Sequence, residues 1–159
     1  MPIIKLTSVI DAPIEVVFDL SRSIELHLAS TEETNERVVA GRASGLIELG
    51  ETVTWRAKHL GVYQNLTSVI TVCQRHSHFA DEMVKGAFKR FRHDHYFSVT
   101  PAGTTMVDTF DYTAPLGVFG RLVDQLFLKK YMTRFLEQRN RCIQEYAESG
   151  KWKSVISAD

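Results

Sequence analysis

The sequence is short of net charge, cysteine and long apolar runs. Nineteen basic and nineteen acidic residues balance, so charge gives no reason to expect nucleic acid or an anionic membrane as a partner. The two cysteines, Cys73 and Cys142, match no metal-binding or redox spacing. No apolar run approaches the roughly 20 residues that cross a bilayer, and Met1–Lys5 lacks the features of a signal peptide. We therefore expect a cytoplasmic protein with free thiols and no membrane span.

Motifs for nucleotide and acyl chemistry are also missing. The sequence contains neither a glycine-rich phosphate-binding loop nor a serine nucleophile elbow. Cys73 has no base beside it in the strand pattern, which gives little support to a cysteine nucleophile. What remains is an ordinary composition, with 44% hydrophobic and 24% charged residues over 159 positions. This length suffices for one well-packed core, and without repeats or linkers we predict a single domain, residues 1–159.

A two-residue alternation of apolar and polar side chains dominates the middle of the chain, and turn residues interrupt it at near-regular intervals. Short turns between consecutive strands favour an antiparallel meander. The pattern predicts strands at residues 51–60, 63–74, 78–86, 88–100 and 103–114.

The first third of the chain mixes strands with short helices. A strand is predicted over Ile3–Ile10, followed by a helix that Asp11 caps and that has Pro13 in its first turn. A second short helix is predicted over 23–29 and another strand over 37–40. The segment Gly41–Gly50 contains Leu46, Ile47 and Leu49, which indicates a bend or a mobile, partly apolar loop.

One face of each strand should be apolar, and the alternation assigns the inward side. The predicted inward set is Val53, Trp55, Ala57, His59, Leu66, Ser68, Ile70, Val72, Phe79, Asp81, Met83, Phe91, His93, His95, Phe97, Met106, Asp108, Phe110 and Tyr112. The turn lengths then set the strand register. They place Asp81 opposite His93 and His95 opposite Asp108, which predicts two carboxylate–imidazole pairs inside an aromatic wall.

Three interpretations of these pairs remain open. Each aspartate can simply satisfy its histidine and order the interior, because buried charged groups need partners. The pairs can also be the polar groups of a small-molecule pocket, which is otherwise apolar. The third interpretation is chemistry, either acid–base catalysis by His93 or His95 or a metal held by both histidines with Asp81 or Asp108. The spacing His-x-His is a weak metal signal, so we predict no metal and no cofactor. Outside the pairs, His27, His76 and His78 lie in or near predicted turns and are expected to be solvated.

The segment after Pro115 predicts the terminal helix. At 100° per residue, the apolar residues before Leu128 and those after it fall on nearly opposite faces. We therefore predict two pieces, a first segment over 118–124 and a main helix over 125–148, with the break between Asp124 and Lys129 or nearer Gly120. The first segment and the loop Gly41–Gly50 are the predicted gates of a cavity.

Four segments resemble a bacterial branch of the START/Bet v 1-like superfamily, also called SRPBCC: Glu51–His59, Phe79–Gly86, Phe91–His95 and Tyr112–Gly117. The resemblance covers essentially the whole chain. It implies an α+β helix-grip fold, in which a curved antiparallel sheet wraps around a long C-terminal helix and two short helices follow the first strand. It also implies a cavity for hydrophobic ligands such as lipids, polyketides, hormones or quinones. The family has no shared catalytic motif to carry over.

The leading prediction is therefore a monomer or homodimer that binds a small hydrophobic molecule. An enzyme of the cyclase, dehydratase or hydrolase type acting through His93 or His95 is the first alternative. A protein-interaction module that uses the apolar loop Leu46–Leu49 is the second. The predicted ligand-binding residues are Trp55, His59, Ser68, Asp81, Phe91, His93, His95, Phe97, Asp108, Phe110, Tyr112, Phe119, Leu128, Tyr131, Met132 and Phe135.

Overall fold

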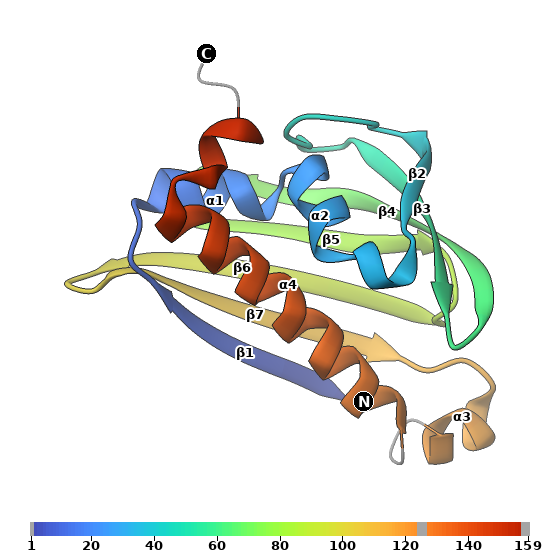
Figure 1. The fold of residues 1–159 in the computed structure, drawn as a ribbon. Helices are drawn as coiled ribbons and strands as arrows, with labels where there is room; N and C mark the ends of the chain where they lie inside the picture. The colour runs from blue at the N-terminus through green and yellow to red at the C-terminus, as the bar shows by residue number, and fades with distance from the viewer. Residues whose placement is uncertain (1, 124–126, 157–159) are drawn as a thin grey trace.

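The fold is a curved antiparallel sheet with helices against one face (Figure 1). The computed structural model describes residues 2–123 and 127–156. The sheet has seven strands in the order β1-β7-β6-β5-β4-β3-β2. Their bounds are β1 Ile3–Ile10, β2 Arg37–Gly41, β3 Thr52–His59, β4 Val62–Gln74, β5 His78–Lys85, β6 Arg90–Thr100 and β7 Gly103–Thr113.

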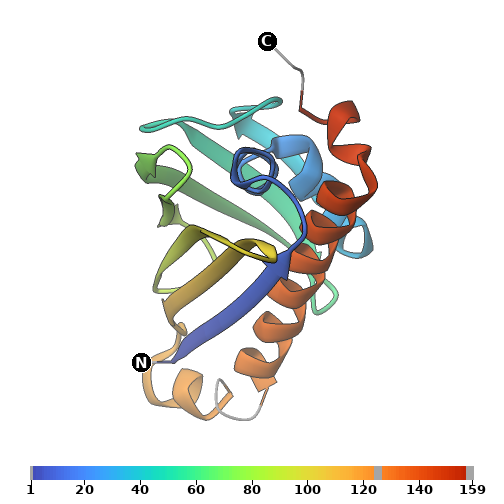
Figure 2. The same cartoon turned by 90° about the vertical axis from the view of Figure 1, so that its left-hand side faces the viewer.

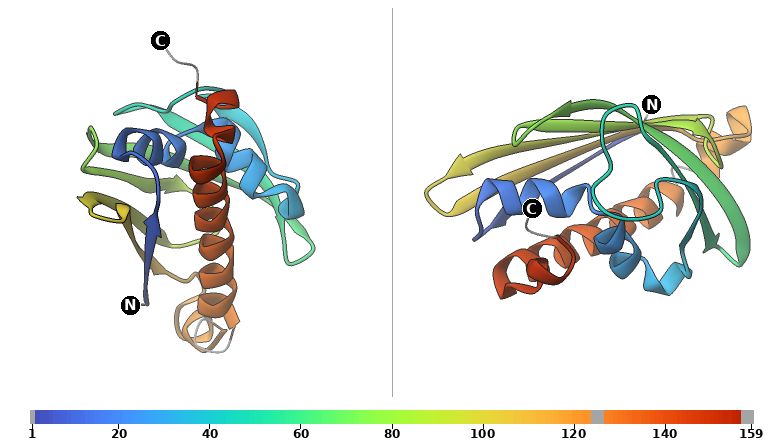
Figure 3. Two further views of the ribbon diagram at one scale, coloured as in Figure 1. Left: turned by 60° about the vertical axis from the view of Figure 1, so that its left-hand side comes forward. Right: turned by 90° about the horizontal axis from the view of Figure 1, so that it is seen from above.

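The helices form the second layer. The sheet bends around the long helix α4, and α1 and α2 lie beside α4 on the same side (Figures 2 and 3). Among the described residues, no helix combines the length and the apolar character needed to span a membrane. This arrangement confirms the predicted α+β helix-grip architecture. The bounds are α1 Ile14–Ser21, α2 Ile24–Ser30, η1 Glu32–Thr34, α3 Gly117–Val123, α4 Lys129–Ser149 and η3 Lys151–Ser154.

The beginnings of the two short helices differ in how they are capped. The Ser23 side chain accepts a hydrogen bond from the amide of Leu26 (3.2 Å) and so caps α2. The predicted cap of α1 is wrong, because Pro13 takes the N-cap position and no side chain caps this helix. The amide of Asp11 instead donates to the Glu148 carboxylate. This bond ties the end of β1 to the end of α4.

The register of the sheet places the predicted polar residues on its concave face. Asp81 lies opposite His93, and His95 lies opposite Asp108, as the turn lengths predict. One inward assignment is wrong. A bulge in β4 between Ile70 and Val72 changes the register, and beyond it Cys73, rather than Val72, packs against the core. A bulge shifts which residues share a face.

The C-terminal region consists of two helices, as the phase change of the apolar residues predicts. Helix α3 ends at Val123 and α4 begins at Lys129, and Figure 1 shows them as separate pieces. The predicted start of the main helix at Gln125 lies outside the described residues. Helix α4 buries a stripe that contains Met132, Leu136 and Ile143. A helix with this spacing of apolar residues turns one face to the sheet.

Candidate ligand-binding site

A cavity of about 320 Å³ lies between the concave face of the sheet and the helices. Strands β3 to β6 supply most of one wall, and α2 and α4 close the other. Most of its lining is aromatic or aliphatic, including Trp55, Phe91 and Phe135. A volume near 300 Å³ is at the lower end of the range for small-molecule sites. The cavity is therefore the candidate functional site.

One end of this cavity reaches the surface. The lining there consists of three exposed residues, Leu60, Ala87 and Pro115, which lie where the chain leaves the sheet. They belong to the β3–β4 turn, the β5–β6 connection and the segment that leads into α3. We call this end the mouth, and α3 lies beside it (Figure 1).

A network of polar side chains forms the inner part of the cavity. We call it the floor cluster, and its members are Asp81, His93, His95, Asp108, Arg139 and Asn140. Asp108 lies at its centre and is 1% exposed. His95 donates from Nδ1 to Asp108 Oδ1 (2.5 Å), and Asn140 donates from Nδ2 to Asp108 Oδ2 (2.6 Å). Both oxygens of this buried carboxylate are thereby satisfied.

The floor cluster is one shared network, although the sequence predicts two separate pairs. His93 Nε2 lies 3.3 Å from Asp108 Oδ1, and His95 Nε2 lies 3.5 Å from Asp81 Oδ1. Each imidazole therefore approaches the aspartate that the register pairs with the other histidine. The 3.3 Å approach does not have hydrogen-bond geometry, so His93 Nε2 has no hydrogen-bond partner within the described part of the chain. An unsatisfied buried polar atom of this kind costs folding free energy, which a hydrogen bond to a ligand would offset.

Burial and charge fix the protonation of this network. Burial, and next the neighbouring His95, lower the pKa of His93 to about 4, although Asp108 and Asp81 oppose the shift. His93 is therefore neutral at pH 7. Burial alone would raise the pKa of Asp108, but its contacts with His93 and His95 hold that pKa well below its usual range. Burial also opposes the charge of Asp81, and the histidines still lower its pKa. Both carboxylates are ionised at pH 7.

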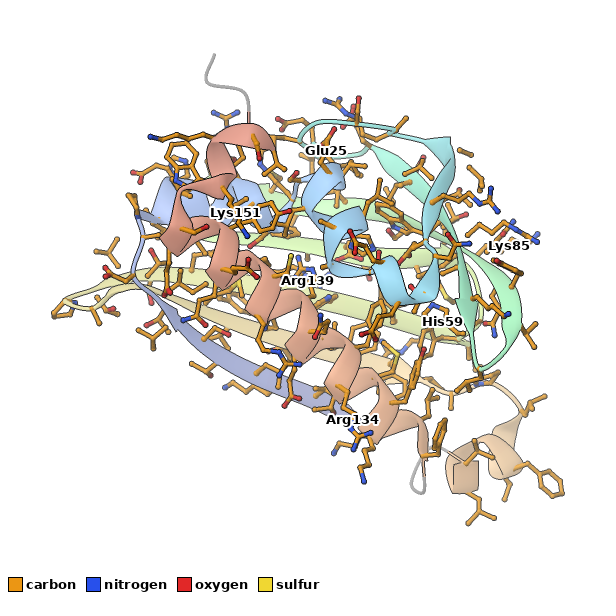
Figure 4. All side chains as sticks on the ribbon, in the orientation of Figure 1. Glu25, His59, Lys85, Arg134, Arg139 and Lys151 are labelled. Carbon is orange, nitrogen blue, oxygen red and sulfur yellow. The ribbon has the colours of Figure 1, made fainter. Side chains whose placement is uncertain are left out.

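Arg139 and Asn140 complete the floor cluster, and the sequence prediction missed both. Arg139 projects from the middle of α4 (Figure 4), and its Nη2 donates to the backbone oxygen of Ser21 (2.7 Å). Its Nη1 lies 3.5 Å from Asn140 Oδ1 and 3.8 Å from Asp108 Oδ1. Arg139 also lines the cavity, and a guanidinium carries five N–H donors. The sequence does contain a signal for the burial of Arg139, because this residue follows Met132 by seven positions and so lies on the buried face of the helix.

The floor cluster also has the composition of a metal site. Asp81, His93 and His95 each bring one ligand atom within 4.8 Å of the others. Two histidines and one carboxylate suit a divalent transition metal. The guanidinium of Arg139 in the same cluster opposes a second positive charge. The prediction that no metal binds here stays a prediction.

A second polar cluster lies closer to the mouth. We call it the rim cluster, and it consists of His27, Glu36, His59 and Tyr131, all of which line the cavity. His59 Nδ1 is 2.7 Å from Tyr131 Oη. The His27 ring stacks on Trp55, with 4.1 Å between ring centroids. The expectation that His27 is solvated is wrong, because its ring lies inside the cavity wall.

Glu36 is the unusual member of the rim cluster. Its side chain is only 5% exposed, and its Oε2 lies 3.3 Å from His27 Nε2. Neither of these two atoms has a hydrogen-bond partner among the residues that the structure describes. Burial alone would raise the pKa of Glu36, but His27, Thr31 and His59 lower it. The cavity thus holds an ionised carboxylate oxygen that accepts no hydrogen bond from the described chain.

Most of the predicted site residues line the cavity, and four do not. Phe97 packs in a core cluster with Phe79, Tyr112 is fully buried in a second core cluster, and Asp108 lies behind His95. Phe119 points away from the cavity and is 81% exposed on α3, so its expected place in the lining is wrong. The residues that line the cavity as expected are Trp55, His59, Ser68, Asp81, Phe91, His93, His95, Phe110, Leu128, Tyr131, Met132 and Phe135.

Hydrogen bonds and an ion pair connect the loop Gly41–Gly50 to the start of α2. The amide of Ile47 donates to the backbone oxygen of Arg22 (3.1 Å), and the amide of Ile24 donates to that of Gly45 (3.0 Å). Arg22 also binds the Glu48 carboxylate (2.7 Å). Ile47 is buried and lines the cavity. These contacts favour a fixed wall over the predicted gate, and they bury part of the apolar surface that an interaction module would use.

Comparison with known proteins identifies the fold. No family model matches the chain, and no curated protein matches it. Solved structures do match it along nearly its whole length. The protein TTHA0849 of Thermus thermophilus has 22% identity and a TM-score of 0.75, over 94% of this chain and 99% of that one.

Two further solved structures share this fold. The di-domain ARO/CYC StfQ from the steffimycin biosynthetic pathway has 11% identity and a TM-score of 0.73, over 94% of this chain and 52% of that one. Major latex-like protein 151 of Panax ginseng has 14% identity and a TM-score of 0.67, over 92% of this chain and 97% of that one. At these identities the likeness establishes the fold alone. The chain has the Bet v 1-like helix-grip fold.

Proposed function

We propose that this protein binds or carries a small, largely apolar organic molecule that has a hydrogen-bond acceptor, such as a carbonyl group. The observation that carries the proposal is the cavity itself, with its aromatic lining and the polar groups of the floor cluster. The Bet v 1-like and cyclase-type neighbours support a ligand of the lipid, polyketide or quinone kind. The free thiols of Cys73 and Cys142 support a reducing, cytoplasmic setting.

In this proposal, the floor cluster binds the hydrogen-bond acceptor of the ligand. The candidate donor groups there are Arg139 and His93, which both line the cavity; His95 is already bonded to Asp108. Asp81 and Asp108 already place negative charge beside them, so a neutral acceptor suits the site better than a carboxylate. The remaining lining is apolar and stabilises the body of the ligand by burial.

Native mass spectrometry of gently purified protein, followed by extraction of the bound molecule, tests this proposal. Ser68 is 4% exposed and lines the cavity, so a phenylalanine there fills the space. We expect Ser68→Phe to lose the bound molecule. Val69→Phe is the matched control, because the next residue of β4 points to the other face of the sheet. Absence of any bound molecule, together with no binding in a lipid and quinone screen, would refute the proposal.

Acid–base catalysis is a second candidate, and one observation favours it. Asp108 holds the imidazole of His95 by a 2.5 Å hydrogen bond while His95 lines the cavity. A carboxylate that orients a histidine in this way is a common arrangement of a general base. The test incubates the extracted molecule with wild-type protein and with His95→Ala and follows products by mass spectrometry. Turnover that His95→Ala abolishes while binding persists supports catalysis, and an unchanged molecule argues for a carrier.

A further inference from the structure

The rim cluster has properties that the packing of the protein does not explain. Glu36 is buried at the edge of the sheet, where β2 begins, and its Oε2 lies 3.3 Å from His27 Nε2. The two side chains approach to 3.3 Å without forming a hydrogen bond, and both atoms are left without one among the described residues. An unsatisfied buried carboxylate oxygen destabilises a fold. A group from outside the chain that donates a hydrogen bond would remove this cost.

The rim cluster differs from the floor cluster, where Arg139 and His93 bring donors into the cavity lining beside the Asp81 carboxylate. An ionised carboxylate only accepts hydrogen bonds, so Glu36 selects a hydroxyl or amino group. His59 and Tyr131 satisfy one another through a 2.7 Å contact, and their rings and that of Trp55 offer flat surfaces for an aromatic body. The floor cluster, with Arg139, presents donors. One cavity therefore has a donor-rich end and an acceptor end.

The distance between the two clusters sets the length of a ligand that reaches both. The rim cluster adjoins β3, which carries Trp55 and His59, and the floor cluster adjoins β5 and β6. Two strand spacings separate β3 from β5 in the sheet, which corresponds to about 10 Å between their backbones. Figure 4 labels one member of each cluster, Arg139 beside the middle of α4 and His59 near the end of β3. The cavity lining includes residues of both clusters.

We propose that the rim cluster is a second polar subsite, in which Glu36 accepts a hydrogen bond from a hydroxyl or amino group at the far end of the ligand. This inference rests on the proposed function and narrows the ligand class. The ligand is an elongated, mainly apolar molecule with a carbonyl at one end and a hydroxyl or amine at the other. A lipid with one polar head and a plain hydrocarbon tail does not use the rim cluster.

A pair of probes that differ only in the donor tests this subsite. The probes are para-acetylbiphenyl and its para′-hydroxy derivative, titrated into the full chain by calorimetry. We expect the hydroxyl group to increase affinity for the wild-type protein by about tenfold or more, as for a hydrogen bond to a charged group. In Glu36→Leu the two probes should bind with nearly equal affinity. Glu33→Gln, which changes an exposed carboxylate in η1, is the matched control and should keep the preference.

The outcomes separate this inference from the proposed function. If both probes bind and the hydroxyl preference is absent, or persists in Glu36→Leu, the rim subsite is refuted while the cavity remains a binding site. If neither probe binds the wild-type protein, the carbonyl-binding floor is refuted and the rim subsite with it. Glu36→Gln keeps the shape of the side chain and removes its charge. It serves as the second variant if Glu36→Leu does not fold, and it should reduce the preference without abolishing it.

Discussion

We expect the free energy of unfolding to fall at acidic pH because His93 is buried in the folded protein. The residue is 6% exposed, and its ring faces His95, Asp81 and Asp108. Burial, and next the electrostatic influence of His95, lower its pKa from 6.5 to about 4. The unfolded chain therefore takes up a proton in a pH range where the folded protein does not. Stability rises with pH across that window and is lost as pH falls from 6.5 towards 4.

The magnitude follows from the two pKa values. A histidine with a pKa of 6.5 unfolded and about 4 folded reduces the free energy of unfolding by about 2 kcal/mol between pH 8 and pH 5. The lowered pKa values of Asp81 and Asp108 contribute stability that is lost only below their ordinary value of 3.8. The corresponding contribution of Glu36 is lost below 4.5. Between pH 5 and pH 8, the pH dependence of the free energy of unfolding therefore reports the histidines and not these carboxylates.

The assay is urea unfolding of wild-type protein and His93→Gln at pH 8 and pH 5. We expect the variant to gain about 2 kcal/mol relative to wild type on going to pH 5, since it has no imidazole to protonate. The lowered pKa of His59 acts in both proteins and cancels. His76→Asn is the control, because His76 lies in the β4–β5 turn outside the cavity lining and has a φ of 64°, which asparagine tolerates. A stability difference between wild type and His93→Gln that is the same at both pH values would refute the argument.

Four further predictions use the same purified protein. Phe119→Ser should change the free energy of unfolding by less than about 0.5 kcal/mol because Phe119 is 81% exposed, whereas Met132→Ala should cost about 2–5 kcal/mol; equal costs in urea unfolding would contradict this placement. Asp108→Asn should cost about 3–5 kcal/mol, because it breaks a buried charged network, and a cost below about 1 kcal/mol would show that the network contributes little. Glu36→Leu should lower the melting temperature of the ligand-free protein only slightly, since the carboxylate that it removes has an unsatisfied oxygen; a fall of more than about 5 °C would indicate a structural role. Zinc should neither raise the melting temperature nor bind in a titration, and a rise that depends on zinc concentration would establish a metal site.

The sequence predicted the sheet well because a strand has a period of two. Every side chain that faces inward shares that period with its neighbours, so turn lengths alone set Asp81 opposite His93 and His95 opposite Asp108. The error at Val72 has a physical reason. A bulge inserts one residue into β4 and has no signature in the local alternation, because either neighbouring residue is apolar enough to face inward.

The side-chain pairing was harder to predict than the register. Backbone register places two residues opposite one another, but imidazole and carboxylate groups reach across to diagonal neighbours. His93 consequently approaches Asp108, and His95 contacts both aspartates. The additional donor Asn140 comes from α4, and no strand pattern contains information about a helix that packs on the sheet.

The alternation of apolar and polar residues did not predict the rim cluster, for a different reason. Glu36 follows a polar run and precedes a short edge strand, which is ordinary for a solvated residue. It is buried because α2 places His27 over it and β3 places Trp55 beside His27. Burial of this kind depends on three segments meeting in space. By contrast, Arg139 had a local signal, since a charged residue in the buried stripe of a helix needs a partner inside.

The energetics of the two clusters argue that they serve a ligand. A cavity built only for stability gains most from apolar side chains, because replacing buried charges by apolar groups is often neutral or stabilising. Here the polar groups remain incompletely satisfied within the described chain, at His93 Nε2 in one cluster and at Glu36 Oε2 in the other. Both clusters border the same 320 Å³ space, where a bound molecule can supply the missing hydrogen bonds. Under the proposed function, that molecule offers an acceptor to the floor cluster and a donor to Glu36.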